Sequence, residues 1–480
     1  MTSDSRWQSP LTTRYASPAM QRLWGEPYRI GRWRRVWLAL AEAERELGLE
    51  IPDIALAEMR AHLDDADLDA AAGYERRFRH DVMAHVHTFG EQAPAARAYL
   101  HLGATSAFIT DNADVMVMRE SLALVLGRAL GVLDAFRGFA QQHAAQPCLA
   151  YTHFQPAQLT TVGKRATLWM QDLALDVEAL VHRLETLRLR GCKGTTGTQA
   201  SFLELFAGDH AKVRELERRI AAKLGIERCF AATGQTYPRK ADAQLLDTLS
   251  GVAQSAAKFG LDMRLLQHEG ELLEPFEAEQ IGSSAMAYKR NPMRAERMGA
   301  LARHVISLQA SGAHTAAAQW LERTLDDSAN RRLTLPEAFL ATDAIVLLWQ
   351  NIASGLEVRP VAIARHVAEQ MPFMATERWL MHGVRAGGDR QALHEVIRRH
   401  SLGAAEAVAN GASNDLLDRL SADPAFARID RAALHAELDP ARYTGRSREQ
   451  VADFLKEYLD PLVSLARSVA TPAEHAEVAV

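Results

Sequence analysis

Cysteine is scarce in this sequence, and its few cysteines show no pairing pattern. The 480 residues contain three, Cys148, Cys192 and Cys229, which are far apart and odd in number. This arrangement fits neither a disulfide framework nor the ligand spacing of a zinc site. It favours a reducing compartment, and we expect a cytoplasmic protein.

Long apolar runs and an excess of basic charge are also missing. No stretch reaches the roughly 20 apolar residues that a membrane-spanning helix needs. The first residues, MTSDSRWQSP, lack the apolar core of a secretory signal peptide. The formal net charge of -5 gives no basic footprint for nucleic acid. We therefore expect a soluble intracellular protein with neither a membrane nor a nucleic-acid partner.

The sequence is rich in helical periodicity. Apolar residues recur at intervals of three and four in five segments, which are 115–140, 169–187, 245–266, 298–308 and 339–352. This spacing is typical of long helices that pack nearly parallel in a bundle, and no run alternates as a strand would. The sequence thus predicts an all-α fold with a central bundle.

Length and breaks in the pattern indicate three domains. We expect an N-terminal helical domain with an irregular binding arm at 1–105, a central bundle at 106–358 and a C-terminal helical domain at 359–480. In the first bundle helix, Leu124, Leu126 and Val132 lie beside the main apolar stripe. The extra apolar surface suits a subunit interface, although a thick monomer core gives the same pattern. We favour the oligomer.

The polar segment 281–296, IGSSAMAYKRNPMRAE, interrupts the bundle pattern. Gly282 and the two serines after it are poor helix formers, whereas Asn291 and Pro292 suit the N-cap and first position of a new helix. A helix N-terminus favours anions. Two hydroxyls and three cationic side chains on one loop indicate an active-site loop that handles an anion. The alternative is an ordinary linker between helices.

Several other chemistries lack their motifs. Gly191–Gln199 is rich in glycine, but neither GxxxxGK[ST] nor GxGxxG follows a strand, which argues against a nucleotide-binding loop of those types. His80, His85 and His87 are candidate zinc ligands. However, His85 does not share the helical face of the other two, and no HExxH motif occurs. The alternatives are packed surface histidines, or one histidine that binds substrate or transfers a proton. No serine nucleophile elbow is present.

The remaining polar loops are rich in Ser, Thr, His, Lys, Arg, Gln and Asn and have few carboxylates. Asp326 and Asp327 are candidate magnesium ligands, but adjacent acids beside arginines are more often helix caps or ion-pair partners. Such loops suit a polyanionic substrate bound by side-chain donors, with histidine as general acid or base. For Lys289, Arg290, Arg294 and Arg297 the alternative is a solvated helix face.

Together these segments resemble a known family. GSSAMAYKRNP at 282–292 is similar to the signature loop GSSxMPxKxNP of the fumarase/aspartase superfamily. The likeness extends through RYASP, RHDVMAHVHTF, HLGATS, THFQPAQLTTVGKR, KGTTGTQASF, TGQTY, RTLDDSANRR, PFMATE and TGRSREQV. Within the superfamily the sequence resembles the adenylosuccinate lyase family, and more closely its animal type.

The resemblance implies an all-helical fold of three domains whose central helices assemble into a homotetramer. Each active site would draw on three subunits. The implied reaction is the β-elimination of fumarate from adenylosuccinate, which leaves AMP, and from the purine precursor SAICAR, which leaves AICAR. The resemblance implies no metal and no organic cofactor.

The resemblance also implies roles for individual residues. Ser283 matches the base that removes a proton next to a carboxylate. His153 matches the acid that protonates the departing nitrogen, paired with Glu296, which would raise the pKa of the histidine. His80 matches a second histidine of the site, and Lys289 a cation beside the base.

Further positions match contacts to the substrate. Phosphate and ribose contacts are matched by Arg14, Tyr15, Arg323, Ser328 and Arg332. Contacts to the succinyl part are matched by Thr105, Ser106, Gln235, Lys289 and Asn291, and Ser284 is a further substrate-binding candidate. Arg79, Asp81 and Arg297 also match residues that line the site.

One departure falls inside the signature loop, where Ala287 stands at the usual proline position. Because alanine leaves the unfolded loop more freedom, we expect a loss of about 0.5–1 kcal/mol in loop stability. Two other functions fit less well. A superfamily lyase for another succinyl-amine or aspartate-derived substrate would not need all three phosphate arginines, and a purely structural bundle would not need His153, Ser283 and Lys289.

Overall fold

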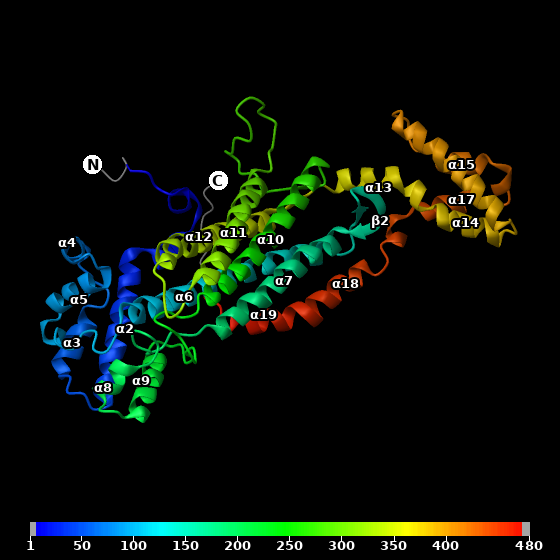
Figure 1. Ribbon diagram of the computed structural model, residues 1–480. Coiled ribbons are helices and arrows are strands. Elements are labelled where there is room, and N and C mark those ends of the chain that lie inside the picture. The colour runs from blue at the N-terminus through cyan, green and yellow to red at the C-terminus, as the bar shows by residue number, and fades with distance from the viewer. Residues whose placement is uncertain (1–5, 473–480) are drawn as a thin grey trace.

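The long periodic segments form a bundle of helices, as predicted. The structure is a computed structural model that describes residues 6–472, and the bundle runs through the middle of the molecule (Figure 1). Its helices are α6 (Ser106–Gln142), α7 (Val162–Thr186), α10 (Lys240–His268), α11 (Met293–Ala318) and α12 (Asp326–Gly355). The predicted helical fold class is therefore confirmed.

Shorter helices cover one end of the bundle. A π-helical turn (Leu11–Tyr15) precedes α1 (Pro18–Trp24), α2 (Glu26–Glu46), α3 (Asp53–Ala61), α4 (Leu68–Phe78), α5 (Asp81–Gln92) and a 3-10 turn (Pro94–Ala96). Two helices from later in the chain join them at this end, α8 (Ala200–Leu205) and α9 (His210–Lys223) (Figure 1). Of these, α9 packs against α2.

The chain after the bundle forms a second, smaller core. The first helix after the bundle, α13 (Pro360–Met374), still packs against the main core through Ile363, Val367 and Met371. The smaller core is formed by α14 (Thr376–Arg385), α15 (Arg390–Ala409), α16 (Leu416–Ala422) and α17 (Arg431–His435), with 3-10 turns at Pro424–Phe426, Ala436–Leu438 and Pro440–Tyr443. Trp379, Leu393 and Leu434 are buried in this core. The chain then returns along α6 and α7 through α18 (Ser447–Asp453), a π-helical turn (Phe454–Leu459) and α19 (Asp460–Arg467) (Figure 1). The division into domains at residues 105 and 358 stays a prediction.

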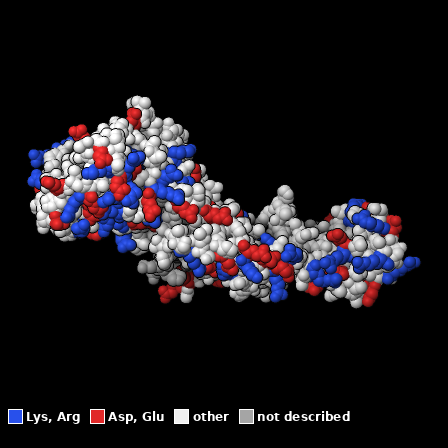
Figure 2. Space-filling view, turned by 90° about the horizontal axis from the view of Figure 1, so that it is seen from below, with Lys and Arg blue, Asp and Glu red and all other residues white. Residues whose placement is uncertain are grey.

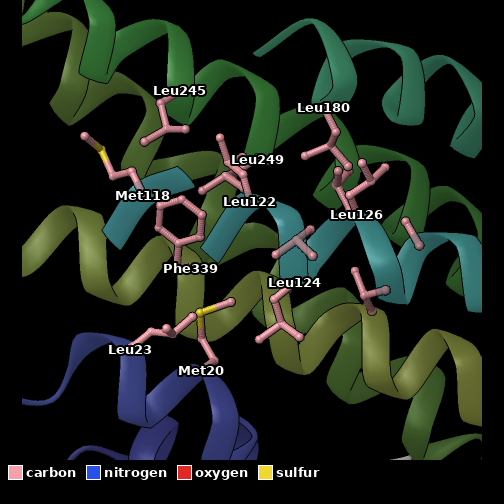
Figure 3. Packing of buried hydrophobic residues seen from close by; sticks show 14 of the residues in the cluster. Met20, Leu23, Met118, Leu122, Leu124, Leu126, Leu180, Leu245, Leu249 and Phe339 are labelled. Atoms are coloured by element: carbon pink, nitrogen blue, oxygen red, sulfur yellow. The ribbon is translucent and has the colours of Figure 1, made fainter. Parts of the chain in front are cut away.

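The bundle core consists of the predicted apolar stripes. Leu122, Leu180, Leu249 and Phe339 come from four different helices and are fully buried. Figure 3 shows these side chains gathered around α6. Each Leu or Phe buried in this way stabilises the fold by about 1.5–3 kcal/mol relative to an exposed position. The periodic residues therefore determine how these helices pack.

The extra apolar surface of α6 serves the chain's own core, which corrects a prediction. Leu124, Leu126 and Val132, expected at a subunit interface, are 6%, 0% and 0% exposed within the single chain. The reason is that α1, α2, α7, α12 and α19 all pack against α6. Apolar side chains do remain exposed on the neighbouring helices α7 and α10. They are Leu168, Leu175, Leu261 and Leu265.

The chain also contains strands that the sequence did not predict. β1 (Pro147–Thr152) and β2 (Gln155–Thr161) form an antiparallel hairpin between α6 and α7, and β3 (Leu272–Leu273) pairs with β4 (Glu357–Val358). Most of β2 is exposed on both faces, so its residues do not alternate between apolar and polar. A register shift between Leu149 and Tyr151 adds further irregularity.

The surface carries charges of both signs. Figure 2 shows Lys and Arg interspersed with Asp and Glu over the face in view, with no broad region of one sign. In the part of the chain that the structure describes, no helix is long and apolar enough to cross a membrane.

Candidate active site

A cavity of about 910 Å³ lies where the N-terminal ends of α5, α6 and α12 meet. Half of the residues that the sequence assigns to the site line this one cavity. They are Arg79, His80, Asp81, Thr105, Ser106, Gln235, Arg323, Ser328 and Arg332. These residues come from four separate stretches of the chain, and folding alone brings them together.

Hydrogen bonds position the donors of this cavity. The amide of Gln235 links two segments, because its Nε2 donates to Thr105 Oγ1 (3.3 Å) and its Oε1 accepts from Arg323 Nη1 (3.0 Å). Ser106 Oγ lies 3.3 Å from His80 Nε2. His80 is the N-cap of α5, and its Nδ1 faces the backbone N–H of Met83. The His80 ring thus lies at the start of α5 and faces Ser106 at the start of α6.

Asp81 and Arg332 form an ion pair at the cavity, with Nη2 and Oδ2 2.6 Å apart. Burial raises the pKa of Asp81, but the hydrogen bonds from Arg332 and the Val82 backbone outweigh this effect. The pKa of the carboxyl group is therefore below its usual value. Asp81 is ionised at neutral pH and holds Arg332 in place.

A network of buried charges supports the cavity wall, and the sequence analysis missed most of it. Arg239 donates to both carboxylate oxygens of Asp111 (3.1 and 3.0 Å) and to Asp327 (2.6 Å). These three side chains are at most 3% exposed and join the N-terminal ends of α6, α10 and α12. The expectation that Asp327 is an ion-pair partner is confirmed, although its arginine lies 88 residues away.

A second buried group extends the network. Arg331 donates to Asp242 Oδ2 (2.7 Å) and to the hydroxyl of Tyr237 (2.6 Å), and that hydroxyl donates to Asp242 Oδ1 (2.6 Å). Burial lowers the pKa of Arg331, but the adjacent Asp242 and Tyr237 raise it above its usual value. Helical periodicity could not reveal the two pairs of Arg331, because their partners lie 89 and 94 residues away in sequence.

The polar segment 281–296 extends away from the bundle as a loop above α11 (Figure 1). Ser283 Oγ accepts from the backbone N–H groups of Ala285 (3.3 Å) and Met286 (3.2 Å), which makes a local turn. Ser284 and Lys289 are exposed. Ser284 and Lys289 therefore face solvent, Ser283 is half-buried, and none of the three lines the cavity of the same chain.

The helix after this loop starts one residue later than predicted. Pro292 is the N-cap of α11, and Asn291 Nδ2 instead donates to the carbonyl of Gly282 (2.8 Å). The first free N–H groups of α11, at Arg294 and Ala295, are accepted by the Glu274 carboxylate (3.0 and 3.1 Å). The anion at this helix N-terminus is thus a side chain of the protein itself.

Three predicted residues gather near the start of α11. The guanidinium of Arg297 lies over the ring of Tyr15, 5.5 Å from its centroid. Burial and the nearby charge of Arg14 lower the pKa of Arg297. The N-terminal arm and α11 thus place two arginines close together, an arrangement that favours an anion between them. Glu296, on the same helix turn, is exposed.

His153 lies at the tip of the β1–β2 hairpin. His153 (φ 55°) and Phe154 (φ 57°) both have left-handed backbone conformations and form its two-residue turn. The hairpin follows α6, whose 37 residues span about 55 Å from their start at Ser106. His153 therefore cannot reach the cavity of its own chain, and no pair between His153 and Glu296 forms within the described chain.

The remaining candidate histidines, His85 and His87, and the three cysteines lie in packed positions outside the cavity. His85 is buried, which lowers its pKa to about 4, and His87 stacks on Tyr74. Burial raises the pKa of Cys148 to about 11 and that of Cys229 to about 12. Among the described residues, no group of three or more His, Cys, Asp or Glu side chains is arranged to hold a metal ion.

Comparison with known families matches two regions of the chain. Residues 36–307 match the family described as Lyase, and residues 372–454 match the family described as Adenylosuccinate lyase C-terminus. The first region alone exceeds half of the chain.

Full-length relatives agree with these matches. The adenylosuccinate lyase of Saccharomyces cerevisiae is 47% identical over 94% of both chains, and that of Schistosoma mansoni is 46% identical over 95% of this chain and 96% of its own. The relative from Pyrococcus horikoshii is 31% identical over 94% of this chain and 98% of its own. The greater similarity to eukaryotic relatives fits the predicted type.

Solved structures share the fold. A 3-carboxy-cis,cis-muconate lactonizing enzyme from Pseudomonas putida superposes with a TM-score of 0.78 at 25% identity, covering 95% of this chain and 98% of its own. A fumarate lyase from Mesorhizobium sp. BNC1 superposes with a TM-score of 0.77 at 24% identity, covering 94% of this chain and 99% of its own. The near-complete matches in sequence show that the chain belongs to the adenylosuccinate lyase family.

Proposed function

We propose that this protein cleaves adenylosuccinate to AMP and fumarate, and SAICAR to AICAR and fumarate. The observation that carries the proposal is the cavity in which Arg323, Ser328 and Arg332 lie together with Thr105 and Gln235. Two arginines and a hydroxyl suit a phosphate. The amide and threonine donors suit a carboxylate, so one cavity offers both kinds of group that these substrates carry.

The proposed chemistry is an acid–base elimination. A base removes a proton from the carbon next to a carboxylate, and the negative charge spreads onto that carboxylate. Because the carbon acid is weak, fixed donors and cations must stabilise this charge as it develops. We assign proton removal to Ser283 with Lys289 beside it, and protonation of the leaving nitrogen to His153, with His80 as a second histidine of the site.

We propose that three subunits of a homotetramer complete each site. The cavity, the loop of Ser283 and the hairpin tip of His153 lie in three places on one chain, and α6 alone separates cavity from hairpin by about 55 Å. The exposed leucines of α7 and α10, at positions 168, 175, 261 and 265, offer apolar surface for the assembly. The unpaired thiols of the three cysteines suit a reducing cytoplasm.

The first experiment adds adenylosuccinate or SAICAR to the purified protein and follows fumarate release by absorbance. Turnover of adenylosuccinate is expected, and no turnover of either substrate would refute the proposed function. Ser283→Ala and His153→Ala should each reduce kcat by at least about a thousandfold with an unchanged circular dichroism spectrum. Ser307→Ala, on the exposed side of α11, provides the matched control.

A mixing experiment tests whether the sites are shared. If base and acid come from different subunits, tetramers formed from equal amounts of the two inactive variants contain some sites with neither lesion. Random assembly gives about one quarter of the wild-type activity. Co-expressed variants that remain inactive, or a monomeric mass at micromolar concentration, would contradict sharing.

A further inference from the structure

A second cavity, separate from the candidate active site, lies between the C-terminal end of α7 and the N-terminal end of α10. Its volume is about 400 Å³, within the range of small-molecule sites. The apolar part of its lining comes from Val115, Met118, Leu187, Phe230 and Leu245. Met118 and Leu245 belong to the bundle core and lie at one edge of it in Figure 3. The floor of this cavity is therefore apolar.

Cations surround this floor. Arg183, Arg188 and Lys240 all line the cavity, and none of them has an ion-pair partner among the described residues. Arg183 donates only to the neutral amide of Gln244 (3.1 Å), and its buried Nε has no hydrogen-bond partner in the described chain. The one acidic group in the lining, Asp242, is already bound by Arg331 and by a tyrosine hydroxyl. The cavity thus has a net positive charge.

The helix geometry adds to this charge. Lys240 is the first residue of α10, a helix of 29 residues, and no side chain caps that end. The positive end of the helix dipole therefore points toward the same space as the three cations. The backbone N–H groups of Ala241, Asp242 and Ala243 are bonded to the carbonyls of Pro238 and Arg239. An anion bound here would therefore gain from the cationic side chains and from the helix dipole, rather than from free N–H groups.

An aromatic surface lines the same cavity. Phe230 is half-buried and stacks on Tyr237 with an interplanar angle of 12°. Arg188 lies 6.0 Å from the centroid of the Phe230 ring. A flat ligand ring beside Phe230 and Arg188 would be favoured by stacking on the aromatic ring and by contact with the guanidinium. Cations, an apolar floor and an aromatic wall together select a ligand that is both anionic and planar.

We infer that this cavity is a second binding site, which takes a purine mononucleotide as an effector. Hydrogen bonds join its wall to the wall of the candidate active site. Tyr237 and Asp242 line the small cavity, and the side chain that binds both of them, Arg331, lines the large one. A ligand that shifts Tyr237 would therefore shift Arg331 and change the affinity for substrate.

The test counts binding sites by isothermal titration calorimetry with AMP. The wild type is expected to bind two AMP per chain. The double variant Arg188→Ala/Lys240→Ala should bind only one tightly, because its affinity for AMP at the small cavity is weakened by about tenfold or more. The control Lys212→Ala/Arg214→Ala removes the same charge from exposed positions on α9 and should still bind two. A cavity variant that binds AMP with the same stoichiometry and affinity as the wild type would overturn the inference.

Two further titrations identify the ligand and separate the sites. Inorganic phosphate and adenosine should each bind the small cavity more weakly than AMP, and phosphate binding as tight as AMP would refute the nucleotide assignment. Arg323→Ala/Arg332→Ala should remove the other binding event and keep this one. The count at the small cavity therefore stands even if the proposed lyase function fails.

Kinetics test the effector role. In the wild type, inhibition by AMP should depart from simple competition with substrate, whereas the Arg188→Ala/Lys240→Ala variant should follow simple competition with kcat and KM unchanged in the absence of AMP. Simple competition in the wild type would overturn the effector role.

Discussion

The carboxyl group of Glu44 allows a quantitative prediction about stability. Glu44 lies on α2, is 0% exposed, and neither of its side-chain oxygens has a hydrogen-bond partner in the described chain. Burial without compensation raises its pKa from 4.5 to about 9. The folded protein therefore keeps this group protonated at neutral pH, whereas the unfolded chain ionises it. We expect Glu44→Gln, which mimics the protonated form, to stabilise the protein at neutral pH.

The size of the effect follows from proton linkage. Between pH 4.5 and 9 the folded state binds one more proton at Glu44 than the unfolded state does, so wild-type stability falls by about 1.4 kcal/mol per pH unit. The stability gained by Glu44→Gln should thus rise from about 2 kcal/mol at pH 6 to about 5 kcal/mol at pH 8. A penalty for burying the amide does not depend on pH and leaves this slope unchanged.

Chemical denaturation of both proteins from pH 5 to pH 9 measures the slope. Glu46→Gln is the matched control on the same helix, because Glu46 is bound by Lys223 and Arg219 and its pKa is lowered. A carboxyl group whose pKa is lower in the folded state stabilises the protein at every pH above its pKa in the unfolded chain. This contribution is lost only at acid pH. The control should therefore change stability by less than about 1 kcal/mol and equally at pH 6 and 8. A difference for Glu44→Gln that does not change with pH would refute the reasoning.

Three further changes test the site. Arg239→Met leaves two buried carboxylates without their cation and should lower the free energy of unfolding by about 3–5 kcal/mol in denaturant titrations; a loss below 1 kcal/mol would contradict the network. Gly282→Ala would place a Cβ 2.1 Å from the carbonyl oxygen of Lys289, so the loop must open. We expect kcat to fall at least about tenfold with an unchanged melting temperature. An unchanged kcat would show that catalysis does not need the close approach of Gly282 to Lys289. Ala287 is the second residue of the turn closed by the Lys289 N–H and the Met286 carbonyl, where proline is favoured. Ala287→Pro should slow proteolysis of the loop by about two- to fivefold, and faster cleavage would show that proline does not fit.

Periodicity predicted the helices well because burial repeats with the helix turn. The apolar residues around Leu122, Leu249 and Phe339 are spaced to meet in one core, and they do so. The hairpin was missed because its turn, His153–Phe154, lacks the glycine or asparagine that usually marks left-handed residues.

The candidate site could be predicted only in part. Resemblance identified Gln235 and Arg323, which the fold places in contact. It did not identify Arg239 or Arg331, because a buried arginine in a helical sequence looks like a surface residue until its distant acid is known. Local sequence could not show that His153 lies far from the cavity, because that separation follows from the direction in which α6 runs.

The length of α6 has an evolutionary consequence under the arrangement that we propose. Its 37 residues set the distance between the cavity at one end and the hairpin at the other. One inserted residue would lengthen the helix by about 1.5 Å and turn everything beyond it by about 100°. The cavity and the β1–β2 hairpin would then no longer be aligned with the hairpin and the cavity of neighbouring subunits. Insertions should therefore be eliminated by selection within the bundle, but tolerated in the exposed connection at residues 410–413 between α15 and α16.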